Sequence, residues 1–163
     1  MLIVKWLVIA VLLLIVLAIA AGQFGFLQGT PPADLGVREG RLKPPSMTEN
    51  SVSSQAALYP DHPQRKYADI APLALKGDGP ATIARIKAIV EGMDGAKVVK
   101  SEPGYLYAQF TTRLMRYVDD VEFWFDPAAN VIQVRSASRV GRGDLGVNRK
   151  RVEAVRAALE ATK

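Results

Sequence analysis

Residues 113–156 read RLMRYVDDVEFWFDPAANVIQVRSASRVGRGDLGVNRKRVEAVR, and this stretch decides the fold of the chain. Apolar and polar side chains alternate over residues 117–125 and again over residues 131–138, which predicts two strands joined by the turn at 126–130. A glycine-rich loop follows. Val152, Val155 and Leu159 then recur at helical spacing, so we expect a helix over residues 148–161, with Asn148 as its N-cap.

The residues upstream of this stretch extend the same pattern. A helix is predicted to start at Asp78, Gly79 and Pro80 and to end at Gly92. Strands are predicted over 96–102 and 105–112, and the apolar residues 67–75 are expected to pair at a sheet edge. The order of these elements predicts an α+β domain: an antiparallel sheet of about four strands, with flanking helices on one face.

The N-terminal part of the chain contains an uncharged apolar run, WLVIAVLLLIVLAIAAG, over residues 6–22. A helix of about 20 apolar residues spans a bilayer, so we expect residues 2–27 to form a transmembrane anchor in contact with membrane lipid. The alternative is a cleaved signal peptide with small residues at 18–20, although the run is longer than a signal peptide requires. The positive charge of Lys5 next to the apolar run predicts that the N-terminus lies on the cytoplasmic side. The expected product is a single-pass inner (cytoplasmic) membrane protein with a periplasmic domain.

Residues 28–66 lie between this run and the predicted domain at 67–163, and they contain six of the ten prolines of the chain. They show no sustained periodicity of either kind, which predicts an extended linker. The only histidine, His62, lies here between two prolines, and the chain has no cysteine. Disulfides, thiolate metal sites and a cysteine nucleophile are therefore excluded. No ligand set in the sequence predicts a metal or another cofactor.

Three carboxylates lie next to one another on the predicted strand 117–125. Asp119 belongs to one face of this strand, and Asp120 and Glu122 belong to the other, so the three do not converge on a metal. Arg135 on the next strand falls opposite Glu122 or Asp120, which predicts a cross-strand ion pair. We expect all four residues to form a structural charge network.

Asp119 points toward the core side in this interpretation. A buried carboxylate needs hydrogen-bond donors or a cation, such as Arg139 or Arg113. A small hydrolase or metal-dependent enzyme that uses the Asp119–Asp120–Val121–Glu122 strand is the alternative function, and the divergent faces make it the less favoured one.

The loop SRVGRGDLG at 138–146 contains a literal G-x-G-x-x-G. A dinucleotide fold needs a further strand after the following helix, and none is predicted here. The basic side chains around the loop can instead hold an anion or a partner surface, unless they only neutralise the nearby carboxylates. The candidate contact residues are Arg139, Arg142, Asn148, Arg149 and Arg151.

The strings DDVEF at 119–123, VRSASRVG at 134–141 and DLGVNRKRVE at 144–153 carry a family resemblance. They resemble the signature of the domain-of-unknown-function family numbered fourteen ninety-nine, over roughly residues 51–159. The resemblance implies a small bacterial or plastid domain, often behind a membrane segment, and no established activity, cofactor or catalytic residue. Many relatives place a cysteine where Ser51 stands here, so a thiol-based role does not apply to this chain.

The net charge of +5 permits contact with anionic lipid, acidic protein or nucleic acid. Nucleic acid is the least favoured partner, because charges alternate in sign along the last predicted helix. The sequence therefore predicts a membrane-anchored accessory or binding domain on the extracytoplasmic side. Its basic glycine-rich loop is expected to contact a membrane protein partner or an anionic ligand.

Overall fold

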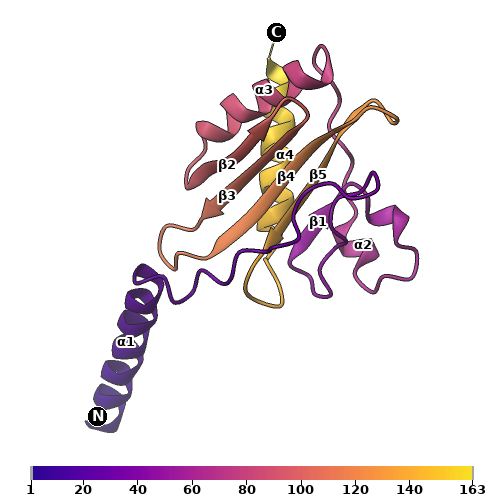
Figure 1. Cartoon of the computed structure of the whole chain (residues 1–163). Coiled ribbons are helices and arrows are strands. Elements are labelled where there is room, and N and C mark those ends of the chain that lie inside the picture. Colours follow the sequence, from indigo (N-terminus) through magenta and orange to yellow (C-terminus); the bar gives the residue numbers. More distant parts are fainter. Residues whose placement is uncertain (1, 163) are drawn as a thin grey trace.

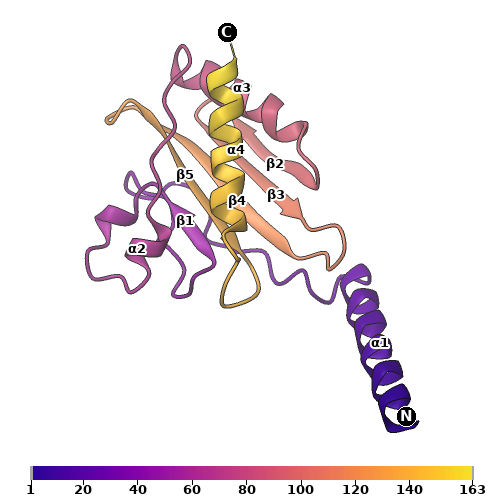
Figure 2. The ribbon, with the colours of Figure 1, turned by 180° about the vertical axis from the view of Figure 1, so that it is seen from behind.

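The computed structural model describes residues 2–162, and it contains one five-stranded antiparallel sheet in the order β1-β5-β4-β3-β2. Helices α3 and α4 cover one face of this sheet (Figures 1 and 2). The predicted α+β class is confirmed. The sheet has one strand more than the four expected. The additional strand is β1, which comes from the proline-rich region (residues 28–66) and pairs with β5.

The elements follow one another along the chain without internal repetition. Their bounds are α1 Leu2–Gln23, β1 Ser51–Ser53, the 3-10 helix η1 Ala56–Leu58, α2 Arg65–Ala68, α3 Gly79–Glu91, β2 Ala96–Glu102, β3 Tyr105–Thr111, β4 Val118–Asp126, β5 Val131–Ser138 and α4 Val147–Ala161. The segment 67–75, predicted to pair at a sheet edge, does so through two isolated bridges, Ser53 with Asp69 and Leu73 with Ile132.

The core lies between the sheet and the two long helices. Alternate residues of β3, β4 and β5 point toward the helices. They pack against the apolar side chains of α3 and α4 that were predicted from helical spacing. The buried side chains include Ile83, Ile86 and Val90 of α3, Leu106, Val121, Phe123 and Val134 of the sheet, and Val152, Val155 and Leu159 of α4. Burial of this apolar surface is the main stabilising contribution to the fold.

The start of α4 differs from the prediction that Asn148 is its N-cap. The helix begins at Val147. Its N-cap residue is Gly146, which has a left-handed backbone conformation and no side chain that could accept a hydrogen bond from the first turn. Asp144 supplies the missing acceptors, since its two oxygens accept from the backbone nitrogens of Gly146 (2.9 Å) and Asn148 (3.0 Å). The side chain of Asn148 points inward and is fully buried.

The second face of the sheet is covered in part by the region predicted to be a linker, which runs from α1 across the sheet to β1 (Figure 1). The backbone nitrogen of Gly36 donates to Glu122 (2.7 Å), and that of Leu42 donates to Gln55 (2.8 Å). Leu42 is buried. This region therefore packs against the domain rather than extending away from it.

Helix α1 leaves the domain at the end that carries the β3–β4 and β5–α4 loops, away from the β4–β5 turn (Figures 1 and 2). By length and composition it is suited to span a membrane, as a signal sequence near an N-terminus also is. Its last turn contacts the domain: Gln23 Nε2 donates to the carbonyls of Arg113 (3.2 Å) and Leu114 (2.9 Å). A Cβ on Gly22 would lie 2.5 Å from the Met115 carbonyl oxygen, so only glycine permits this approach.

Candidate functional site

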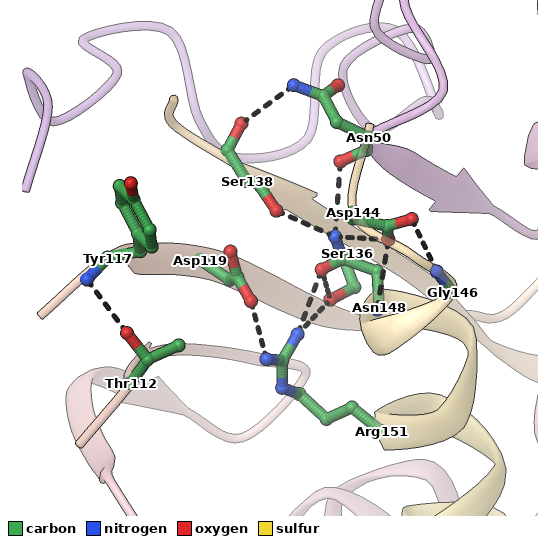
Figure 3. Close-up of polar contacts among 10 residues, drawn as sticks. All are labelled: Asn50, Thr112, Tyr117, Asp119, Ser136, Ser138, Asp144, Gly146, Asn148 and Arg151. Atoms are coloured by element: carbon green, nitrogen blue, oxygen red, sulfur yellow. Dashed lines mark hydrogen bonds and ion pairs between the residues drawn. The ribbon is translucent and has the colours of Figure 1, made fainter. Parts of the chain in front are cut away.

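Arg151 lies at the centre of a polar network between the first turns of α4 and the ends of β4 and β5. Its Nη2 donates to Asp119 Oδ2 (2.5 Å), and its Nη1 donates to Ser136 Oγ (3.1 Å) and Asn148 Oδ1 (2.8 Å), as Figure 3 shows. The guanidinium also lies 4.6 Å from the centre of the Phe110 ring, a cation–π contact. Asp119 and Arg151 are both almost fully buried in this arrangement.

Asn148 connects this pair to the loops on either side. Its Nδ2 donates to the carbonyl of Asn50 (3.1 Å), to Ser138 Oγ (3.0 Å) and to Asp144 Oδ2 (2.8 Å), and its Oδ1 accepts from Ser136 Oγ (2.5 Å). These partners come from the segment before β1, from β5 and from the β5–α4 loop (Figure 3). Asn148 therefore fixes the position of the loop relative to the sheet and is not accessible to a ligand.

Asp144 receives a further hydrogen bond from the hydroxyl of Tyr67. Burial raises the pKa of Asp144, but the donors Tyr67, Gly146 and Asn148 outweigh it, so the pKa lies below its ordinary value. Burial and the neighbouring carboxylate raise the pKa of Tyr67 to about 12. At neutral pH the pair is therefore a charged acceptor and a neutral donor.

The opposite face of the sheet carries a second polar cluster. Arg139 forms two hydrogen bonds with Asp120, from Nε to Oδ2 (2.8 Å) and from Nη2 to Oδ1 (2.7 Å). The hydroxyl of Tyr107 donates to the same carboxylate (2.6 Å). This is the planar, bidentate geometry in which an arginine binds a carboxylate most strongly. Arg139 is thus occupied inside the protein.

Glu122 lies in the same layer and is completely buried. Its Oε1 accepts from the hydroxyl of Tyr105 (2.8 Å), and its Oε2 has no partner. Burial is the main cause that raises the pKa of Glu122 above its ordinary value. Arg135 lies directly opposite Glu122 in the register. The expected ion pair within 4 Å is not formed among the described residues, because Arg135 Nε donates instead to the carbonyl of Pro44 (3.2 Å).

The carboxylates of β4 therefore have separate environments. Asp119 lies on the helix-covered face, and Asp120 and Glu122 lie on the other face, each with different partners. Over residues 2–162, no group of three or more His, Cys, Asp and Glu side chains is placed to hold a metal ion. Asp119 is thus separated by the sheet from Asp120 and Glu122, which share the other face.

An open cleft of about 760 Å³ lies next to the Asp119–Arg151 pair, between the β3–β4 loop and the start of α4. Phe110 and Arg151 line it, together with three other cations, Arg113, Arg116 and Lys150. No side-chain hydrogen bond or ion pair joins these three cations to any residue in the described part of the chain. Asp94 is the only carboxylate among the described residues that line the cleft. Hence the cleft carries a net positive charge.

A family model for proteins of unknown function, DUF1499, matches residues 41–159, which include every element from β1 to β5 and all but the last two residues of α4. The chain belongs to the DUF1499 family. The match begins ahead of β1, so residues 41–50 of the proline-rich region, with the buried Leu42, lie within the DUF1499 match, whereas Gly36 lies outside it. No curated protein matches the chain. No solved structure matches it either.

The DUF1499 domain uses most of the predicted contact residues internally. Arg139 and Arg151 bind Asp120 and Asp119, and Asn148 is buried. Arg149 donates to the carbonyls of residues 67 (2.6 Å) and 69 (2.8 Å). Arg142 alone of the five is exposed, with no hydrogen bond or ion pair to another described residue.

Of the cations that line the cleft, Arg151 was a candidate contact residue from the sequence, Arg113 was considered only as a partner for Asp119, and Arg116 and Lys150 were missed. The signal was nevertheless present in the string RLMR at 113–116, which places two apolar side chains and two arginines in the loop between two strands. A loop of this composition is unusual, because apolar residues in an exposed loop need a contact elsewhere.

Proposed function

We propose that this DUF1499 chain is a membrane-anchored binding domain that acts as an accessory protein on the extracytoplasmic side. Its ligand is an anion or an acidic partner surface, bound at the end of the sheet next to α1. The observation that carries this proposal is the set of cations at that end with no internal partner among the described residues: Arg113, Arg116, Arg142 and Lys150.

The contrast with the other basic residues near the β5–α4 loop supports a binding role. Arg139 and Arg151 are paired with carboxylates of the domain itself, and the guanidinium of Arg149 donates to two backbone carbonyls, so all three are held inside the fold. Arg113, Arg116, Arg142 and Lys150 lack such a partner among the described residues and gather at this end of the domain, where they attract anions. Arginine forks and a lysine ammonium group are the side chains that bind phosphate and carboxylate groups most readily.

The contacts of α1 support an anchor that is retained. A signal peptide is removed and needs no fitted contact with the mature domain. Here Gly22 fits against Met115, and Gln23 bonds to two carbonyls of the β3–β4 loop. Lys5 on the short side of the helix favours a cytoplasmic N-terminus, which places the DUF1499 domain outside.

The proposal is tested with the full chain in nanodiscs of neutral lipid, titrated with inorganic phosphate and followed by NMR. We expect shifts at the cleft, and at least tenfold weaker binding after Arg113→Gln with Lys150→Gln, because a hydrogen bond to a charged group contributes about 1.5–3 kcal/mol. A matched control, Arg38→Gln with Lys97→Gln, removes the same charge elsewhere on the surface. Equal loss in both double variants, or no binding at all, would contradict a specific anion site.

A further inference from the structure

The end of the domain next to α1 exposes apolar side chains as well as cations. Leu145 is 94% exposed and Leu114 is 57% exposed, and each lies in a loop at this end. Leu145 also has a φ of 52°, in the left-handed region that is unfavourable for a large side chain. The fold gains nothing from this residue in water, because its side chain contacts almost nothing and its backbone is strained. A surface outside the protein accounts for the exposed leucine side chains, because it would remove them from water.

The chain that emerges from α1 runs against both of these loops. Gly22 and Gln23 contact residues 113–115 of the β3–β4 loop. A Cβ on Gly29 would lie 2.7 Å from Val140 Cγ2, so the same chain also packs on the β5–α4 loop. Figures 1 and 2 both show the two loops at the end from which α1 departs. Just after α1, Phe24 and Phe26 are highly exposed, as aromatic residues at a membrane interface are.

We propose that the ligand of this surface is the bilayer that α1 crosses. The loops 112–117 and 139–147, which we term the membrane-facing end, lie in the headgroup layer. Leu114 and Leu145 enter the interface, and the free cations bind the phosphate groups of anionic phospholipids. This inference rests on the proposed function, because only a retained α1 holds the loops at the membrane.

The chemistry of the membrane-facing end fits an anionic lipid surface better than a soluble anion. Apolar tips flanked by lysine and arginine are the composition of segments that lie in a membrane interface. Anionic headgroups attract clusters of basic residues over about one Debye length. A small free anion would use the cations but would leave Leu114 and Leu145 in water. The cleft of about 760 Å³ lined by Arg113, Arg116 and Lys150 is large enough for a phospholipid headgroup.

The absence of cysteine allows a direct test on the full chain. Leu114→Cys and Leu145→Cys are each labelled with the fluorophore NBD and placed in nanodiscs of phosphatidylcholine, with or without phosphatidylglycerol. Ala129→Cys, in the exposed β4–β5 turn at the opposite end, is the matched control. We expect blue-shifted emission and quenching by doxyl-labelled lipid at positions 114 and 145, and quenching by aqueous iodide at position 129. Phosphatidylglycerol should strengthen the lipid contact, and Arg113→Gln with Arg116→Gln and Lys150→Gln should abolish that increase.

Iodide quenching at positions 114 and 145 as strong as at position 129, in discs with phosphatidylglycerol, would overturn the inference. If phosphate still bound the cleft in that case, the proposed function would stand, with a soluble anion or an acidic protein as the ligand. Release of the chain from the discs by alkali would instead contradict the proposed anchor. The two failures are therefore distinguishable in the same preparation.

Discussion

Asp119 and Arg151 form a buried ion pair at the point where the sheet, α4 and the cleft meet. Each side chain is almost fully buried, and Arg151 also donates to Ser136 and Asn148. A buried pair adds little stability compared with apolar side chains of the same shape, but the loss of one partner leaves an uncompensated charge. The pair therefore fixes the position of Arg151 in the cleft wall more than it stabilises the domain.

The substitution Asp119→Ala is expected to lower the free energy of unfolding by about 3–5 kcal/mol, because Arg151 would stay buried without its counter-ion. Urea denaturation of the full chain in detergent measures this change. Asp94→Ala, an exposed carboxylate of the same cleft, is the control and should change stability by less than about 0.5 kcal/mol. An unchanged midpoint for Asp119→Ala would show that the ion pair has no structural role.

Asp144 gives the domain a pH dependence with a defined sign. Its pKa is lowered in the folded state, so its contribution to stability is present above the ordinary value of 3.8 and is lost as the pH falls through the folded pKa. We expect Asp144→Asn to be less stable than the parent at pH 7 and the difference to shrink below about pH 4. Denaturation curves at several pH values measure it. A difference independent of pH would argue against a charged Asp144 in the fold.

At the scale of elements, the proline-rich region is part of the domain. Leu42, which belongs to this region, is buried, and β1 extends the sheet. Leu42→Ala should therefore lower the free energy of unfolding by about 2–5 kcal/mol, as expected for a leucine in a core. Leu58→Ala, at a residue that is 47% exposed, is the matched control, and its effect should be clearly smaller. Equal effects would mean that residues around 42 are not packed in solution.

The elements that sequence could predict are those with local patterns. The strands β4 and β5 show period-two alternation around a clear turn, and α4 shows a helical stripe, so their positions followed from local rules. The strand β1 is only three residues long, and its partner, Ala137 for Ser51, is far away in the sequence. Nothing local identifies such a pairing.

The candidate site was less predictable for a related reason. Side chains as long as arginine choose among several carboxylates and carbonyls within reach, and tertiary packing decides the choice. Arg139 thus binds Asp120, whereas Arg151, from a helix first turn, reaches Asp119. The cap of α4 similarly depends on Asp144 folding back onto it, rather than on the expected Asn148.

At the scale of the whole molecule, α1 and the loops 112–117 and 139–147 lie at one end, and the β4–β5 turn and the C-terminal end of α4 lie at the other (Figures 1 and 2). These two loops carry the exposed Leu114 and Leu145. The helix α1 and the two loops with free cations and exposed leucines therefore belong to the same end of the domain. Under the proposed function, in which α1 is a retained anchor, the contacts of Gly22 and Gln23 with the loops of the domain hold one face of the domain toward the membrane. On that proposal, the cleft opens where anionic headgroups are concentrated.

The account depends most on α1 being retained in a membrane with the domain outside. The direct measurement is alkaline carbonate extraction of cells that express the full chain with Ala129→Cys, combined with intact mass and with labelling by a membrane-impermeant maleimide. The account predicts a chain that stays in the membrane fraction, keeps its α1 residues and reacts with the maleimide on the outer side. Recovery of a chain that lacks α1, or that is released by carbonate, would contradict it.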